Sequence, residues 1–163
     1  MKHVWMICCV ALLSLPAVAA AQPAKTTAIY QQEIALTRAA MESQRKVVVI
    51  ENLKLDGSAN ENGFWQVYNA YRAEMGKVGD RRVKVIADYA DAYRQGSVSD
   101  KLAAKLLDRY LAVLQDQVKV KKRFVRKFKK VLSAKQVARF YQIDNRLDLL
   151  VNMQIAAGVP LME

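Results

Sequence analysis

The residues whose types and spacing point most directly to chemistry form a basic segment that runs from Lys119 to Lys130. Eight of its twelve residues are cationic and none is acidic. The cations are Lys119, Lys121, Lys122, Arg123, Arg126, Lys127, Lys129 and Lys130. Val120, Phe124 and Phe128 recur between them at helical spacing, so we expect these three to face inward and the cations to face solvent. Such a surface either attracts anionic partners at long range or only keeps the protein soluble.

Two pairs of carboxylates also invite a chemical interpretation. Asp88 and Asp91 lie one helical turn apart, and Asp144 and Asp148 are spaced in the same way. Paired carboxylates act as acid and base in glycosidases. Cations stand at helical spacing from both pairs, namely Lys84 and Arg94 for the first and Lys135, Arg139 and Arg146 for the second. We therefore expect the four carboxylates to form ion pairs rather than a catalytic site.

An aromatic segment, Phe64-Trp65-x-x-Tyr68-x-x-Tyr71, is the third notable pattern. Aromatic side chains at this spacing line a binding groove in some proteins. More often they belong to the core, with the tyrosine hydroxyls at its rim. We expect the core role here.

The N-terminus resembles a secretory signal peptide over residues 1–21. Lys2 precedes an uncharged apolar run, Val4 to Leu15, and small residues before Gln22 provide a cleavage site near Ala21. A membrane anchor is the alternative, but the apolar run is short for a span of about 20 residues. We expect export to the periplasm or the medium, with no transmembrane span after cleavage.

Cleavage would remove the residues that most catalytic and metal sites require. His3, Cys8 and Cys9 are the only histidine and cysteines of the 163 residues. A mature chain without them has no disulfide, no Cys/His zinc site and no histidine-dependent triad. Loss of Lys2 lowers the net charge from +11 to +10. We therefore expect no enzyme, no cofactor and no metal.

The periodicity of apolar residues predicts an all-α bundle of about five helices, two or three of them long and antiparallel. After residues 22–27, which we expect to be mobile, the first helix spans residues 27–53. The β-branched run Val47 to Ile50 competes as a strand, but no turn residue precedes it. A turn over residues 56–60 leads to helices at 60–75 and 80–95, separated at Gly76 and Gly79.

The second half of the chain carries clearer helix boundaries. Gly96 is placed for a left-handed cap, and Ser99 begins a long helix that we expect to reach Leu132. Ser133 and Gln136 match a capping box that opens the last helix, which Gly158 and Pro160 end. Apolar stripes include Val83, Ile86, Tyr89, Ala90 and Tyr93 in the third helix, Tyr110 in the fourth and Leu150 in the last. Residues 22–163 form one predicted domain.

Two resemblances follow from these motifs. The element Leu132-Ser133-x-x-Gln136 resembles the L-T-x-x-Q element of the Spy/CpxP group of small exported helical proteins, with Ser133 in place of threonine. A closer likeness is to exported bacterial helical proteins with an F-W-x-x-Y-x-x-Y segment and an A-R-F-x-Q-I-[DE]-N segment, here Ala138 to Asn145. The second likeness implies no activity. The first implies an ATP-independent surface that holds partly unfolded or signalling proteins.

The sequence therefore supports two functional interpretations that share the basic segment. In the first, the protein is a stress-associated, chaperone-like periplasmic protein that binds unfolded or acidic envelope proteins through a cationic and apolar helix surface. In the second, the same helix binds anionic lipid or cell-wall polymer. Nucleic acid is not an expected partner of an exported protein, and a homodimer is an open alternative.

Overall fold

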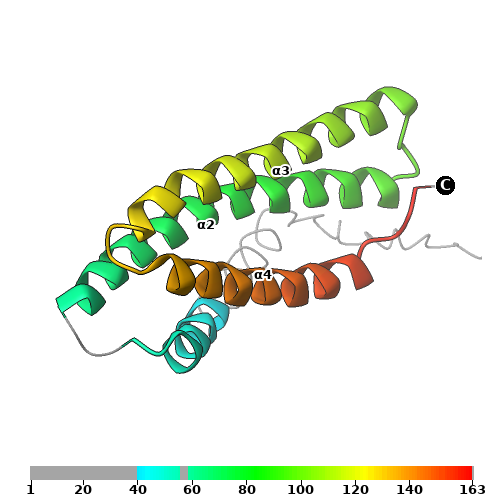
Figure 1. Ribbon diagram of the computed structural model, residues 1–163. Helices are drawn as coiled ribbons and strands as arrows, with labels where there is room; N and C mark the ends of the chain where they lie inside the picture. Colours follow the sequence, from blue (N-terminus) through cyan, green and yellow to red (C-terminus); the bar gives the residue numbers. More distant parts are fainter. Residues whose placement is uncertain (1–39, 56–58, 163) are drawn as a thin grey trace, which may run out of the picture. The chain divides into compact units, whose positions relative to one another are not determined.

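The computed structural model describes residues 40–55 and 59–162. The predicted signal peptide, residues 22–27 and the first part of the predicted first helix lie outside the described residues. Residues 41–163 form one compact unit. The described residues contain four helices and no strand: residues 40–53, α2 (Ala59–Arg94), α3 (Asp100–Phe128) and α4 (Ala134–Ala157) (Figure 1). The all-α prediction is confirmed, whereas the expected count of about five helices is wrong.

The count differs because α2 runs without a break through both glycines that were expected to interrupt it. A glycine in a helix interior costs only about 1 kcal/mol relative to alanine. The buried row of α2 continues from Met75 and Val78 on one side of the glycines to Val85 beyond them. Packing of this row outweighs the intrinsic cost of Gly76 and Gly79.

The continuous helix also turns a different face inward than predicted. Val85, Tyr89 and Ala92 are buried, whereas Tyr93 is exposed. Val83, Ile86 and Ala90 are only half-buried. The predicted stripe assumed that a separate helix begins near residue 80. In one unbroken helix, the positions that face inward instead continue the row of the first half.

Helices α2 and α3 form an antiparallel hairpin that carries the rest of the fold (Figure 1). Gly96 has a φ of +60°, which confirms the predicted left-handed position after α2. The Ser99 side chain accepts a hydrogen bond from the Leu102 backbone N–H, as expected of an N-cap. Helix α3 ends at Phe128, four residues before the predicted end at Leu132, and a tight turn leads to α4.

An aromatic core lies between α2, α3 and the first half of α4. Phe64, Tyr71, Phe124, Phe128 and Phe140 are all essentially inaccessible to solvent. Their rings meet mostly edge to face or tilted, and the centroids of Phe128 and Phe140 are 4.5 Å apart. Such pairs contribute about 0.5–1.5 kcal/mol each beyond the burial of area. The aromatic segment of α2 is therefore core, with Trp65 half-buried at its edge.

The buried residues of helix α4 all lie in its N-terminal half. The predicted capping box is present, with Ser133 and Gln136 bonding each other's backbone N–H groups. Val137, Phe140 and Asp144 are the buried residues of α4, and Leu150, which we expected in its core stripe, is 60% exposed. The far end of α4 diverges from α3 (Figure 1). This divergence leaves apolar side chains of both helices accessible.

Candidate binding surface on helix α3

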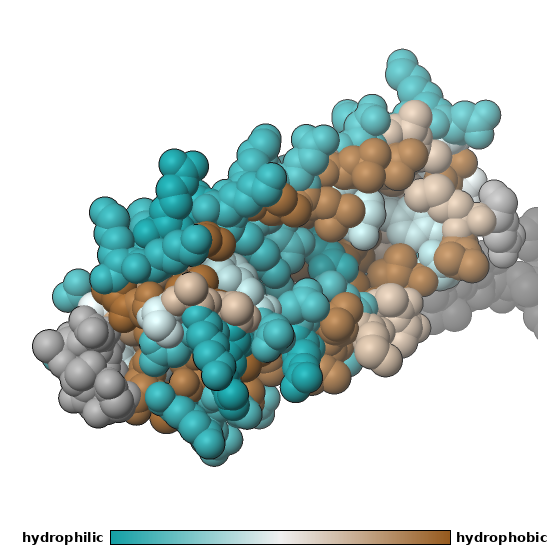
Figure 2. All heavy atoms as spheres, viewed as in Figure 1, coloured by the Kyte–Doolittle hydropathy of each residue, from teal (hydrophilic) through white to brown (hydrophobic). Residues whose placement is uncertain are grey.

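The basic segment occupies the last three turns of α3 and the turn that follows. Val120, Phe124 and Phe128 point into the core, as their spacing predicted. All eight cations except Lys121 are exposed. Figure 2 shows hydrophilic side chains along the outer side of α3. The surface predicted from the sequence is therefore present, but its cations are not equivalent.

Three of the eight cations are held by carboxylates. Lys121 lies 3.0 Å from an oxygen of Asp148 and 3.5 Å from one of Asp144. Arg123 bonds Glu74 across the hairpin at 2.5 Å, and Lys119 lies 3.2 Å from Asp116 on its own helix. These side chains have charged neighbours that offset much of their potential.

The remaining cations project without such partners. Lys122, Arg126, Lys129 and Lys130 form no ion pair with another described residue, and all four are exposed. The ammonium of Lys127 lies 4.6 Å from the centre of the Phe124 ring, a cation–π contact. These cations give α3 a positive end that is available to an anionic partner.

An exposed apolar row precedes the free cations on the same face of α3. Leu107, Leu111 and Val118 are 56%, 46% and 51% exposed. Their steps of four and seven residues keep them on one side of a helix, and the same steps lead on to Lys122 and Lys129. This face is thus apolar over the three turns from Leu107 to Val118, and cationic from Lys122 to Lys129, the residue that follows α3.

Two carboxylates form a separate, buried ion cluster, here called the Asp144 cluster. Asp144 is 1% exposed and accepts hydrogen bonds from Tyr71 Oη at 2.6 Å and Arg45 Nη1 at 3.0 Å. Arg72 Nη1 lies 3.5 Å from it. Asp148 accepts from Arg45 Nη2 at 3.0 Å, from Lys121, and from Gln117 at 3.4 Å. The cluster ties the helix over residues 40–53 to α2, α3 and α4.

Ion pairing of the carboxylates was expected, but the expected cations were largely wrong. Among the described residues, Lys135, Arg139 and Arg146 form no ion pair with the Asp144 cluster; Arg139 instead donates to the Asn52 carbonyl at 2.6 Å. For the first carboxylate pair, Asp91 bonds the expected Arg94, whereas Asp88 pairs with Arg109 of α3 at 2.7 Å. Helical spacing predicts ion pairs within one helix, but it does not predict pairs between residues of different helices that pack together.

Burial and charge shape the ionisation of groups around the core. Burial raises the pKa of the Tyr71 phenol, and the charge of Asp144 and its hydrogen bond raise it further, so Tyr71 remains a donor. Burial raises the pKa of Tyr68 to about 12. On the surface, hydrogen bonds from Lys77 and Arg123 lower the pKa of Glu74 to about 2. Tyr71 and Glu74 therefore keep the ionisation state that their hydrogen bonds require, protonated for Tyr71 and ionised for Glu74.

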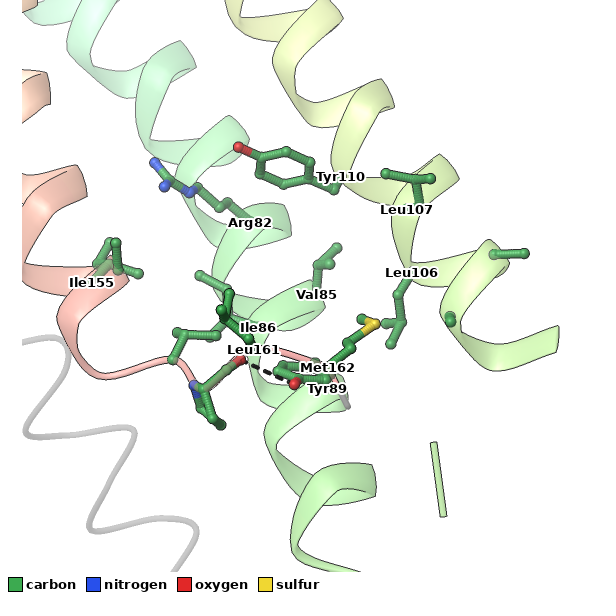
Figure 3. A pocket seen from close by; sticks show the side chains of 15 residues that line it. Arg82, Val85, Ile86, Tyr89, Leu106, Leu107, Tyr110, Ile155, Leu161 and Met162 are labelled. Carbon is green, nitrogen blue, oxygen red and sulfur yellow. Dashed lines mark hydrogen bonds between the residues drawn. The ribbon is translucent and has the colours of Figure 1, made fainter. Parts of the chain in front are cut away.

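A groove of about 540 Å³ opens at the other end of the hairpin, where α4 diverges. Apolar side chains of α2, α3 and the end of α4 form its walls, and the segment from Val159 to Met162 crosses beside it (Figure 3). Tyr89 Oη holds this segment by donating to the Pro160 carbonyl at 3.0 Å. Tyr110, which we expected in the core, lines this groove and is 39% exposed. Sequence reasoning missed the groove because no local pattern marks the divergence of a helix.

Two further properties bear on function. In the described part of the chain, no group of three or more His, Cys, Asp and Glu side chains is arranged to hold a metal ion. No helix among residues 40–55 and 59–162 combines the length and the apolar character needed to cross a membrane.

Comparisons with models of protein families, with curated proteins and with solved structures found no match. Functional inference therefore rests on the geometry of the surfaces described above.

Proposed function

We propose that this protein is a non-enzymatic, chaperone-like binding protein of the bacterial envelope that holds acidic, partly unfolded proteins on the exposed face of α3. The supporting observation is the continuity of that face. Leu107, Leu111 and Val118 offer apolar contact, and Lys122 and Lys129 follow at the same helical steps. An unfolded acidic client presents both apolar side chains and carboxylates, so it matches both halves of this surface.

The two halves would contribute different parts of binding. Unpaired cations attract anionic chains at long range and raise the rate of encounter, an effect that weakens as salt rises. Exposed leucine and valine side chains then gain about 25 cal/mol for each Å² of apolar area removed from water. A shallow row gives weak and reversible contacts, which suit the temporary holding of a client.

Aggregation of a reduced acidic protein, such as α-lactalbumin, tests the proposal. We expect the protein to suppress light scattering at equimolar ratio in low salt, and to suppress it less as salt is added. Reduced lysozyme, a basic client, should be protected poorly. Equal protection of both clients, or no protection of either, would contradict the proposal.

Matched variants locate the surface. The double variant Lys122→Gln, Lys129→Gln removes two unpaired cations from the face and should reduce protection of α-lactalbumin. Lys101→Gln with Lys105→Gln removes the same charge from another face of α3 and should leave protection unchanged. The exposed Val118→Ser exchange should weaken protection at every salt concentration. Equal losses from both double variants would show that only net charge matters.

Binding to anionic lipid is the alternative, and the four unpaired cations near the end of α3 favour it. Co-sedimentation with phosphatidylglycerol vesicles tests it, with phosphatidylcholine vesicles as the neutral control. Lys122, Arg126 and Lys130 are the residues to neutralise, because Lys121 belongs to the Asp144 cluster and its loss would disturb folding. Binding to anionic vesicles that the triple variant abolishes, without protection of α-lactalbumin, would replace the proposed function with this one.

Export is part of the proposal, because an envelope client requires it. N-terminal sequencing of the protein isolated from the envelope fraction should begin near Gln22. Recovery from the cytoplasm with Met1 attached would contradict both export and the proposed client.

A further inference from the structure

We propose that the groove between the diverging ends of α3 and α4 binds a single-chain fatty acid, with the acyl chain along the apolar walls and the carboxylate on Arg82. This site is separate from the cationic end of α3, shares only Leu107 with the proposed client surface, and goes beyond the proposed client binding. Its volume of about 540 Å³ lies in the range of small-ligand sites, about 300–1,000 Å³.

The walls of the groove select for hydrocarbon. Val85, Ile86, Leu106, Ile155 and Met162 line it, and the main exceptions are Arg82 and two tyrosine hydroxyls. One of these hydroxyls, that of Tyr89, already donates to Pro160. A ligand with several polar groups would leave them without partners, at a cost of about 1–3 kcal/mol each. An acyl chain has no such groups.

Arg82 supplies the complementary charge for one anionic head. Its Nη1 donates to Asn152 Oδ1, whereas its Nε is buried and has no hydrogen-bond partner among the described residues. Because this Nε is shielded, a head group would meet only the accessible part of the guanidinium. Arg82 forms no ion pair with another described residue, so a carboxylate there would form a charge-assisted hydrogen bond and neutralise its charge. Figure 3 shows Arg82 at the edge of the groove, with its guanidinium directed away from Leu106 and Met162.

A peptide fits this groove less well than a fatty acid does. An extended peptide brings one N–H and one C=O for each residue, and the walls offer few partners for them. A helical peptide satisfies its own backbone, but a helix about 10 Å across fills roughly 120 Å³ for each residue of 1.5 Å rise. The groove would then hold little more than one helical turn. A helix from a second copy of this chain would be limited in the same way, because the groove would hold little more than one turn of it.

Laurate is a suitable probe, and methyl NMR of the purified chain gives a direct readout. We expect laurate to shift the methyl resonances of Ile86 and Ile155, and to leave that of Val118 on the outer face unchanged. Each shortening of the fatty acid by two methylenes should weaken binding roughly tenfold, since about 0.8 kcal/mol is lost per methylene. No shift at the groove, or shifts only elsewhere, would overturn the proposal.

Substitutions separate the head site from the chain site. Arg82→Gln should weaken laurate binding at least tenfold and leave binding of uncharged dodecanol unchanged, whereas Lys84→Gln, which removes an exposed charge of α2, should affect neither. Ala104→Phe should fill the groove and abolish binding of both, while Ala112→Phe, an exposed exchange in the same helix, should not. Equal effects of Arg82→Gln on laurate and dodecanol would overturn the role of Arg82. The Lys122→Gln, Lys129→Gln variant should retain laurate binding, so failure here is distinct from failure of client binding.

Discussion

The exchange Asp144→Asn tests the Asp144 cluster most directly, because it removes one charge with almost no change in volume. The carboxylate is 1% exposed and lies beside two arginines and a tyrosine hydroxyl. Removing one member of a buried ion pair costs about 3–5 kcal/mol, since the partner charge is left without compensation. Asp148 still accepts from Arg45 at 3.0 Å, so we expect the lower end, about 3 kcal/mol.

Thermal and urea denaturation monitored by circular dichroism measure this loss. In a domain of this size, about 3 kcal/mol corresponds to a fall in Tm of roughly 10 °C. Asp91→Asn is the control, because Asp91 pairs with Arg94 at a site where both side chains are mostly exposed. We expect that exchange to change the free energy of unfolding by no more than about 0.5 kcal/mol.

A double-mutant cycle with Tyr71→Phe separates the cluster from general effects of substitution. Tyr71→Phe alone removes a buried hydrogen bond to a charged acceptor and should cost about 1.5–3 kcal/mol. In the Asp144→Asn background it should cost less, by a coupling energy of at least about 0.5 kcal/mol. Additive effects, or an Asp144→Asn loss no larger than that of Asp91→Asn, would refute the buried cluster.

Three further predictions concern single elements of the fold. Gly76→Ala and Gly79→Ala should each stabilise the protein by about 0.5–1 kcal/mol in urea denaturation, because both lie inside α2 and an added Cβ meets no atom within 4 Å. Ser133→Ala should destabilise it by about 1 kcal/mol in the same assay, because the capping box of α4 is lost. The stabilising effect of Glu74, measured against Glu74→Gln, should be present above pH 4.5 and decline as the pH falls toward 2, because its folded-state pKa is about 2.

Controls make these outcomes decisive. Gly96→Ala should destabilise, in contrast to the α2 glycines, because Gly96 has a φ of +60°. A loss of stability from alanine at either α2 glycine would instead indicate the break that the sequence suggested. Ser99→Ala should match Ser133→Ala if both hydroxyls cap helices, and an unchanged Ser133→Ala would show that its box contributes nothing. A Glu74 effect that does not vary between pH 4.5 and 2 would contradict its ion pairs.

Local chemistry made several features predictable from the sequence alone. The caps at Ser99 and Ser133, the left-handed Gly96 and the inward positions of Phe124 and Phe128 each depend on residues within one or two turns of each other. Helical periodicity and capping act over that range, so the amino-acid pattern contains the necessary information.

Only the tertiary structure decided which charges are compensated and where apolar surface stays accessible. Asp144 forms ion pairs with Arg45 and Arg72, which belong to segments distant in sequence. Lys121 pairs with the same carboxylate and therefore contributes little to the exposed basic surface. The groove exists because α4 diverges beyond its last buried residue, which no local pattern records. Ion pairing and burial depend on which helices meet, and that is set by the packing of all of them together.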